Sequence, residues 1–349
     1  MQQTRKTMVG RGEREMIDMD AENLDIRMKV VGVGGGGGSV LWRLAEDHVP
    51  DIELIAVDTT EKNLSRLEKG GVQTIQIGER LTHGYGTGGK ADVGAKAAEA
   101  AEDKIRSALA GANLVFITSG FGGGVGTGAA PVVARIAKEM GLLSVAIVTK
   151  PFMFEGVRKR KAAEAALEKM RGYVDALVVI RNDNLLRLAE KKLSMAEAFH
   201  LADDVLRQGI RLVADLACTT DYINVDFADL SMILQASSFS DAVLGIGESE
   251  NGSAEEAVRR AVESPLLDRT LTGVKHAILD IVGDESLTMK AAEEAAEFVS
   301  QKAGGEIDIL FGAVCDPAMA GRVKAMLVAT GFDEDVSKEA IGQQNMVHC

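Results

Sequence analysis

The sequence predicts an α/β protein in which a parallel, doubly wound sheet is followed by a smaller α+β domain. Three observations predict this fold class. Strand-like apolar runs alternate with helical patterns over roughly the first half of the chain. One long amphipathic segment follows, and the pattern beyond it changes to strand-rich segments with fewer helices. The 349 residues also suffice for two domains, since one domain takes roughly 100 to 200 residues.

The first predicted domain spans residues 27–193 and should contain a Rossmann-like sheet. Its expected strands are Arg27–Val33, Leu54–Val57, Thr74–Ile77, Leu114–Thr118, Leu143–Thr149 and Ala176–Ile180. Helices are expected between them, at Val40–Asp47, Gly94–Leu109, Ala129–Met140 and Val157–Met170. Ligands of such sheets bind at the carboxyl ends of the strands, which is where the glycine-rich segments of this sequence fall.

Residues 194–217 are predicted to form one long helix that connects the two domains. Ser194 and Glu197 have the spacing of a capping box, and apolar residues recur at helical intervals as far as Leu216. At 1.5 Å per residue this helix would be about 36 Å long, enough to cross a whole domain.

The second predicted domain spans residues 218–332. Its expected strands are Leu230–Gln235, Ala242–Ile246, Ala277–Val282, Ile307–Val314 and Lys324–Ala329, with helices near Ala254–Glu263 and Leu287–Lys302. We expect residues 1–26 to be a flexible extension and residues 333–349 a short polar tail.

Composition excludes several classes of function. The net charge of −13 repels nucleic-acid phosphates, so nucleic-acid binding is not expected. The three cysteines are widely separated and form no CxxC pair, which excludes a disulfide framework or a zinc site. No signal peptide or membrane-spanning apolar run is visible, so we expect a cytoplasmic protein without direct membrane insertion.

Gly34–Gly38, five glycines in a row, follow the first strand and precede a helix expected to start near Ser39. Such a turn lets backbone N–H groups approach a phosphate, and the helix N-terminus favours negative charge. This loop alone is ambiguous, because it also fits G-x-G-x-x-G, and Asp58 lies where a dinucleotide fold has its ribose-binding acid. A nicotinamide-dependent oxidoreductase is therefore an alternative.

A second glycine-rich loop, Gly120–Gly128, also follows a strand and opens a helix. Two phosphate-binding loops at one sheet edge suit a di- or triphosphate, whereas a dinucleotide site needs only one. Neither loop ends in the Gly-Lys-Ser/Thr of a Walker motif.

Gly120–Gly128 with the following Ala-Ala-Pro closely resembles the signature loop of tubulin as it occurs in the FtsZ family of cell-division GTPases. The resemblance continues in VVGVGGGGGS (30–39), TIQIGERLTHGYGTGG (74–89), TKPFMFEG (149–156), RNDNLL (181–186), EAFHLADDVLRQGI (197–210) and NVDFADL (224–230). It covers roughly residues 27–332 and implies the tubulin/FtsZ fold and a GTP-hydrolysing protein that polymerises head to tail, with a role in cell division.

The resemblance also implies roles for particular residues. Those expected around GTP or GDP in the two loops are Gly35, Gly36, Ser39, Gly120, Gly123, Gly124, Val125, Gly126 and Thr127. Glu155 would hold the ribose with Lys159 nearby, and Asn182 would lie beside sugar and base. Phe199 would stack on guanine and Asp203 would accept its N1–H and N2–H₂ donors. A carboxylate in that position selects guanine over adenine, whose corresponding edge lacks this pair of donors.

Asn224, Asp226 and Asp229 are implied to complete the site of the next subunit and to position the attacking water. Mg²⁺ would be held mainly by phosphates and water, with no metal-binding residues of its own, and the expected partner is another copy of the chain.

Some positions depart from the family pattern. Val125, Ser39 and Lys159 stand where threonine, asparagine and arginine are usual, and Asp58 replaces a polar amide. They leave open an alternative, a nucleotide-binding filament or regulatory protein of the same fold with little or no hydrolysis.

Overall fold

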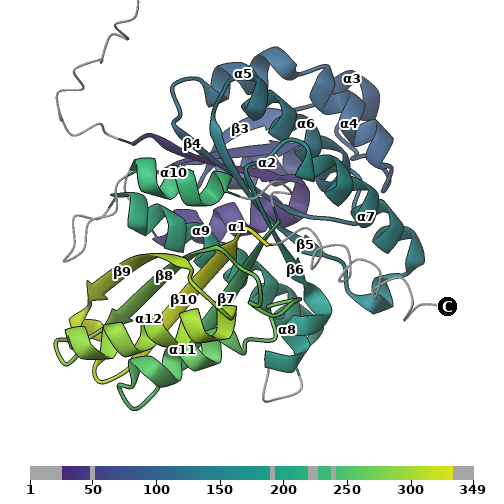
Figure 1. Cartoon of the computed structure of the whole chain (residues 1–349). Coiled ribbons are helices and arrows are strands. Elements are labelled where there is room, and N and C mark those ends of the chain that lie inside the picture. Colours follow the sequence, from purple (N-terminus) through teal and green to yellow (C-terminus); the bar gives the residue numbers. More distant parts are fainter. Residues whose placement is uncertain (1–25, 48–51, 189–192, 219–226, 237–240, 333–349) are drawn as a thin grey trace, which may run out of the picture.

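The computed structural model describes residues 26–47, 52–188, 193–218, 227–236 and 241–332, which form one ten-stranded sheet covered by helices (Figure 1). The strand order across the sheet is β3-β2-β1-β4-β5-β6-β7-β10-β8-β9. The strands are β1 (Met28–Val33), β2 (Ile52–Asp58), β3 (Gln73–Gln76), β4 (Leu114–Gly120), β5 (Leu143–Lys150), β6 (Ala176–Arg181), β7 (Asp241–Ser249), β8 (His276–Gly283), β9 (Asp308–Cys315) and β10 (Val323–Thr330). All pairings among β1–β6 are parallel, which confirms the predicted fold class.

The second half of the sheet is mixed. Among the described residues, strand β7 pairs in parallel with β6 through two residue pairs, Leu177 with Asp241 and Val178 with Ala242. Beyond it, β10 lies antiparallel between β7 and β8, while β9 is parallel to β8. The smaller α+β part is therefore joined to the parallel part by a short pairing.

Helices cover both faces of the parallel strands. The helices of the described residues are α1 (Gly34–Asp47), α2 (Glu61–Glu68), α3 (Glu79–Thr82), α4 (Ala91–Glu99), α5 (Glu102–Leu109), α6 (Val125–Glu139), α7 (Val157–Arg171), α8 (Asn182–Leu188), α9 (Met195–Cys218), α10 (Phe227–Gln235), α11 (Ala254–Val262) and α12 (Met289–Ala303), with 3₁₀ turns η1 (Met153–Glu155) and η2 (Pro317–Met319). Because side chains alternate along a strand, Val30 packs on one face with α1, α2, α9 and α10, and Val31 on the other with α4–α7. Helices α11 and α12 cover the β7–β10 part.

Helix α9 is the long helix that the sequence predicted, and Figure 1 shows it between the parallel strands and the β7–β10 part. Its capping box is present: the Ser194 N–H donates to the Glu197 carboxylate at 2.7 Å, and the Glu197 N–H donates to the Ser194 hydroxyl at 3.3 Å. Buried α9 residues such as Ile210 belong to one core cluster with Ile147 of β5 and Leu244 of β7. The helix thus joins both parts through a shared core.

Four predicted elements differ from the structure. Residues 230–235, predicted as a strand, lie in helix α10, because Leu230, Ile233 and Leu234 are buried at helical spacing while Met232 is 57% exposed. The predicted single helix 94–109 is two helices, α4 and α5, and α5 begins with acidic residues that favour a helix N-terminus. Helices α1 and α6 begin at Gly34 and Val125, several residues earlier than predicted, because the glycine-rich segments themselves enter the helices.

Within the described ranges, no helix combines the length and the apolar character that crossing a membrane requires.

Candidate functional site

The two glycine-rich segments lie against each other at the carboxyl ends of β1 and β4. A Cβ on Gly34 would come within 2.8 Å of the Gly126 nitrogen, and one on Gly36 within 3.0 Å of the Gly120 nitrogen. Gly34 also has a φ of +72°, a conformation that side chains disfavour. This close backbone approach therefore requires glycine, and it brings the N-terminal ends of α1 and α6 to one place.

The second loop is held by its own hydrogen bonds and by the turn that precedes α4. The Gly122 N–H donates to the Thr127 hydroxyl at 2.8 Å, which fixes the loop onto the first turn of α6. A Cβ on Gly124 would overlap the Thr87 hydroxyl oxygen at 1.8 Å. By contrast, a Cβ on Gly35 or Gly123 would meet no atom within 4 Å, so these two glycines face open space. Backbone N–H groups at such helix starts can bind phosphate oxygens.

Val125 makes a different contribution from the rest of this loop. Its side chain is buried and belongs to the core on the α4–α7 face of the sheet. The residue at this position therefore packs α6 and adds no hydrogen-bonding group to the loop.

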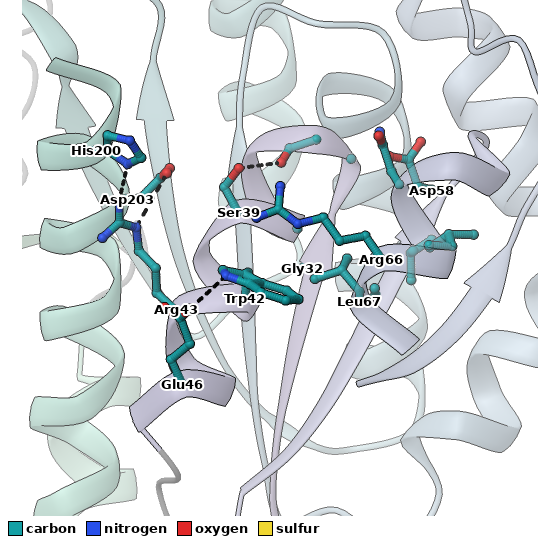
Figure 2. A pocket seen from close by; sticks show the side chains of 17 residues that line it. Gly32, Ser39, Trp42, Arg43, Glu46, Asp58, Arg66, Leu67, His200 and Asp203 are labelled. Atoms are coloured by element: carbon teal, nitrogen blue, oxygen red, sulfur yellow. Dashed lines mark hydrogen bonds and ion pairs between the residues drawn. The ribbon is translucent and has the colours of Figure 1, made fainter. Parts of the chain in front are cut away.

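A cavity of about 330 Å³ lies beside the first loop, between α1, α2 and α9 (Figure 2). Gly35, Gly38, Ser39 and Trp42 line it along α1, and Asp203 lines it from α9. Of the predicted residues, the structure thus brings Gly35, Ser39 and Asp203 into one cavity.

Asp203 is a partly buried acid of this cavity, with 17% of its side chain exposed. Burial raises the pKa of its carboxyl from 3.8 to about 6; the Arg43 charge opposes this rise and nearby Asp204 adds to it. The Arg43 Nε lies 3.8 Å from an Asp203 carboxylate oxygen, and its guanidinium also forms a hydrogen bond with the ring of His200. The carboxylate is therefore oriented toward α1 and can accept hydrogen bonds from a ligand in the cavity.

Arg43, Trp42, His200 and Arg66 are cavity residues that the sequence analysis did not single out. Helical periodicity could have found Trp42 and Arg43, because both lie about one turn beyond Ser39 on α1. No local pattern marks Arg66 of α2.

Three aromatic rings lie together where η1 meets α9. The Phe152 ring is buried, stacks on Phe154 at a centroid distance of 5.0 Å and meets the edge of Phe199 at 5.3 Å. Phe199 keeps 42% of its surface exposed. The Phe199 ring thus packs against Phe152 and keeps an exposed part that can stack on a flat ligand.

Glu155 and Lys159 are bound to each other. The Glu155 carboxylate accepts from the Phe152 N–H at 2.9 Å and from the Lys159 ammonium at 2.8 Å. The lysine charge is therefore directed at a carboxylate in this structure.

Asn182 begins α8 directly after β6 and is 4% exposed. Among the described residues nothing bonds to its Oδ1, so the amide has an acceptor to offer a ligand.

Of the three predicted catalytic residues, only Asp229 lies within the described residues. It is exposed in the first turn of α10. Asn224 and Asp226 lie outside them.

Asp58, which the oxidoreductase interpretation needed for a ribose, has partners within its own turn. Its carboxylate accepts from the backbone N–H groups of Thr59 at 2.6 Å and Thr60 at 3.2 Å, and from the Asn63 amide at 3.1 Å. It caps the turn that leads into α2.

Comparison with known proteins identifies this arrangement. The model of the Tubulin/FtsZ family GTPase domain matches residues 27–190, and that of the FtsZ family C-terminal domain matches residues 240–333. The chain is 37% identical to FtsZ from M. jannaschii, solved as an empty dimer, over 88% of both chains with a TM-score of 0.82.

Two proteins from Haloferax volcanii share the fold at lower identity. CetZ2, in a GTPγS-bound protofilament, is 24% identical over 92% of this chain and 100% of its own, with a TM-score of 0.74. CetZ1, a GDP-bound monomer, is 20% identical over 91% of this chain and 100% of its own, with a TM-score of 0.75. The two domain matches and the 37% identity to FtsZ together show that the chain belongs to the tubulin/FtsZ family.

Proposed function

We propose that this protein binds GTP and GDP and hydrolyses GTP where two copies of the chain meet head to tail in a filament. One observation carries the proposal: the glycine-rich starts of two helices lie against each other beside a cavity whose far wall holds the partly buried Asp203. The N-terminal ends of α1 and α6 can bind the oxygens of a di- or triphosphate. The Asp203 carboxylate can accept hydrogen bonds from the N1–H and N2–H₂ donors of guanine.

The remaining nucleotide contacts follow from the positions of the predicted residues. Phe199 stacks on the base with its exposed part, and the free Asn182 oxygen accepts from sugar or base. Glu155 can hold the ribose only by sharing its carboxylate with Lys159. The phosphates contact the open side of the loops at Gly35 and Gly123, with Gly36, Gly120, Gly124, Gly126 and Thr127 holding the two loops in place.

Hydrolysis in this proposal needs a second copy of the chain. Asn224, Asp226 and Asp229 of one subunit would position and polarise the water that attacks the γ-phosphoryl group bound to the next. Mg²⁺, held by the phosphates, would neutralise the charge that develops during phosphoryl transfer.

Exposed apolar side chains around this site suit the docking of a second copy. Met153 and Phe154 of η1, Val157 of α7, Leu186 of α8 and Met195 of α9 are each 46–65% exposed. Apolar surface of this kind marks contact sites for other proteins. The proposed partner is the Asp229 end of another copy, in a cytoplasmic filament that serves cell division.

The alternative, a filament or regulatory protein with little hydrolysis, is favoured by one contact. Because Lys159 is paired with Glu155, its charge is less available to the phosphates than that of a free side chain.

GTP turnover per subunit, measured against protein concentration with magnesium, tests the proposal. A shared site predicts almost no turnover below a threshold concentration and a steep rise above it. Asp226→Ala and Asp229→Ala should each abolish the rise, whereas Glu306→Ala, at an exposed acid of the β7–β10 part, should not. A rate per subunit that does not change with concentration would contradict the shared site, and GTP binding without turnover would favour the alternative.

A further inference from the structure

One wall of the cavity is formed by a cation on an aromatic ring. The Arg66 guanidinium of α2 lies over the indole of Trp42 of α1, with its central carbon 4.5 Å from the ring centroid. Trp42 is the only tryptophan of the sequence, and its Nε1 donates to Glu46 at 3.0 Å, which fixes the ring plane. This pair gives the cavity a positively charged side opposite Asp203.

Arg66 differs from the other arginine that lines the cavity. Arg43 already faces the Asp203 carboxylate at 3.8 Å. Within the described part of the chain, no carboxylate lies within ion-pairing distance of Arg66, whose partner is the Trp42 ring. Its hydrogen-bond donors are therefore available to a ligand, since a ring face accepts none of the five N–H groups in a directed way.

The position of this pair along α1 indicates which part of a nucleotide it would meet. Trp42 lies seven residues beyond Gly35, about 10 Å farther along the helix from the phosphate-binding start. Trp42 is adjacent in sequence to Arg43, which contacts Asp203. Because Arg66 lies on Trp42, Arg66 and Asp203 lie beside the same turn of α1, on opposite sides of it. Figure 2 shows the Arg66 side chain extending across Trp42 toward Ser39. The pair is thus nearer to the base than to the phosphates.

The two sides of the cavity match the two edges of guanine. The edge with N1–H and N2–H₂ needs acceptors, which Asp203 offers, while the adjacent edge has the acceptors O6 and N7, to which arginine commonly donates a forked pair. Ser39 cannot take this role as an asparagine amide could, because its hydroxyl donates to the Gly35 carbonyl at 3.2 Å. We propose that Arg66, held on the Trp42 ring, donates to O6 and N7 of the bound guanine and is a second residue that selects guanine over adenine.

This inference rests on the proposed guanine-nucleotide site, and its test separates the two. Calorimetry with GDP, 7-deaza-GDP, IDP and ADP measures each contact separately: 7-deaza-GDP lacks N7, and IDP lacks the N2 amine that faces Asp203. In the unaltered protein, GDP should bind more tightly than 7-deaza-GDP. Arg66→Ala should weaken GDP binding about 5- to 150-fold, as expected for loss of a forked contact. It should also abolish the difference between GDP and 7-deaza-GDP and leave the penalty for IDP unchanged.

Matched variants control for charge and folding. Lys62→Ala removes an exposed positive charge from the same helix away from the cavity and should not alter binding. Arg66→Lys keeps the charge without the fork and should not restore the 7-deaza-GDP penalty. Trp42→Phe keeps a ring beneath Arg66 and should retain most of the affinity, whereas Trp42→Ala should resemble Arg66→Ala.

The fluorescence of Trp42 gives an independent signal. Because it is the sole tryptophan and contacts Arg66, its emission should change when GDP binds, and this change should be lost in Arg66→Ala. Equal loss of GDP and ADP affinity in Arg66→Ala would mean a phosphate contact and would overturn the inference. A 7-deaza-GDP penalty that persists in Arg66→Ala would also overturn it. Failure of the unaltered protein to bind any guanine nucleotide would instead refute the proposed function.

Discussion

The partly buried carboxylate of Asp203 predicts that GDP binding depends on pH. In the proposed site guanine donates two hydrogen bonds toward this carboxylate, so only its ionised form should bind well. With a pKa of about 6 in the empty protein, roughly nine sites in ten are protonated at pH 5. The apparent Kd for GDP should therefore rise about tenfold between pH 7.5 and pH 5.

The same shift predicts the opposite trend for the stability of the empty protein. The pKa of the Asp203 carboxyl is higher in the folded protein than in the unfolded chain. The contribution of its protonation to folding stability is therefore complete below about pH 4 and is lost as the pH rises through about 6. A rise from 3.8 to about 6 corresponds to at most roughly 3 kcal/mol. Asp203→Asn should thus unfold at higher urea concentration than the unaltered protein at pH 7.5, while binding GDP more weakly.

Urea unfolding and GDP calorimetry at several pH values test both parts. The phosphates of GDP also titrate near pH 6, and Asp203→Asn corrects for this because the ligand is the same. If the affinity of Asp203→Asn fell with acidity as steeply as that of the unaltered protein, the carboxylate would not be the group responsible. If the variant were less stable at pH 7.5, the argument from burial would be refuted.

Three further predictions concern other parts of the molecule. Gly126→Ala should lower the free energy of unfolding by about 1–3 kcal/mol, since the added Cβ would lie 2.3 Å from the Ser119 hydroxyl oxygen. In Gly123→Ala the added Cβ faces open space, so this variant should keep its melting temperature and weaken only GDP binding. Ser194→Ala should cost about 1 kcal/mol in urea unfolding through loss of the α9 cap, and unchanged stability would contradict a structural role for the capping box. Phe199→Ala should weaken GDP binding with little change in stability, because the ring is 42% exposed; calorimetry that gave equal affinities would exclude stacking.

Much of the fold could be predicted because local patterns in this sequence agree with the tertiary structure. The apolar runs of β1 and β4 are buried on both faces, and the Ser194–Glu197 capping box marks the start of α9. The error at α10 arose because Leu230, Ile233 and Leu234 fit a short apolar strand as well as a helix face, and six residues are too few for periodicity to decide.

The candidate site was less accessible to such reasoning. The glycine segments stand out by composition, but the first one alone also suggested an oxidoreductase, which the family assignment replaces. Arg43 and Asp203 are separated by 160 positions, and Trp42 and Arg66 by 24, so only the packing of α1 against α9 and α2 brings them together. The long-range contacts that bring these charged side chains together in the cavity are therefore not visible in the local sequence.

Sharing α9 between the two parts has a consequence for any attempt to divide the protein. A chain truncated before Ser194 would lose the helix that covers Val30, Phe116 and Ile147, leaving an apolar sheet face in water. It would also leave β6 without β7, as an open strand edge with unpaired backbone groups. Such a fragment should aggregate by strand addition, so fragments for expression are better ended after β10, where the sheet retains all ten strands of the described residues.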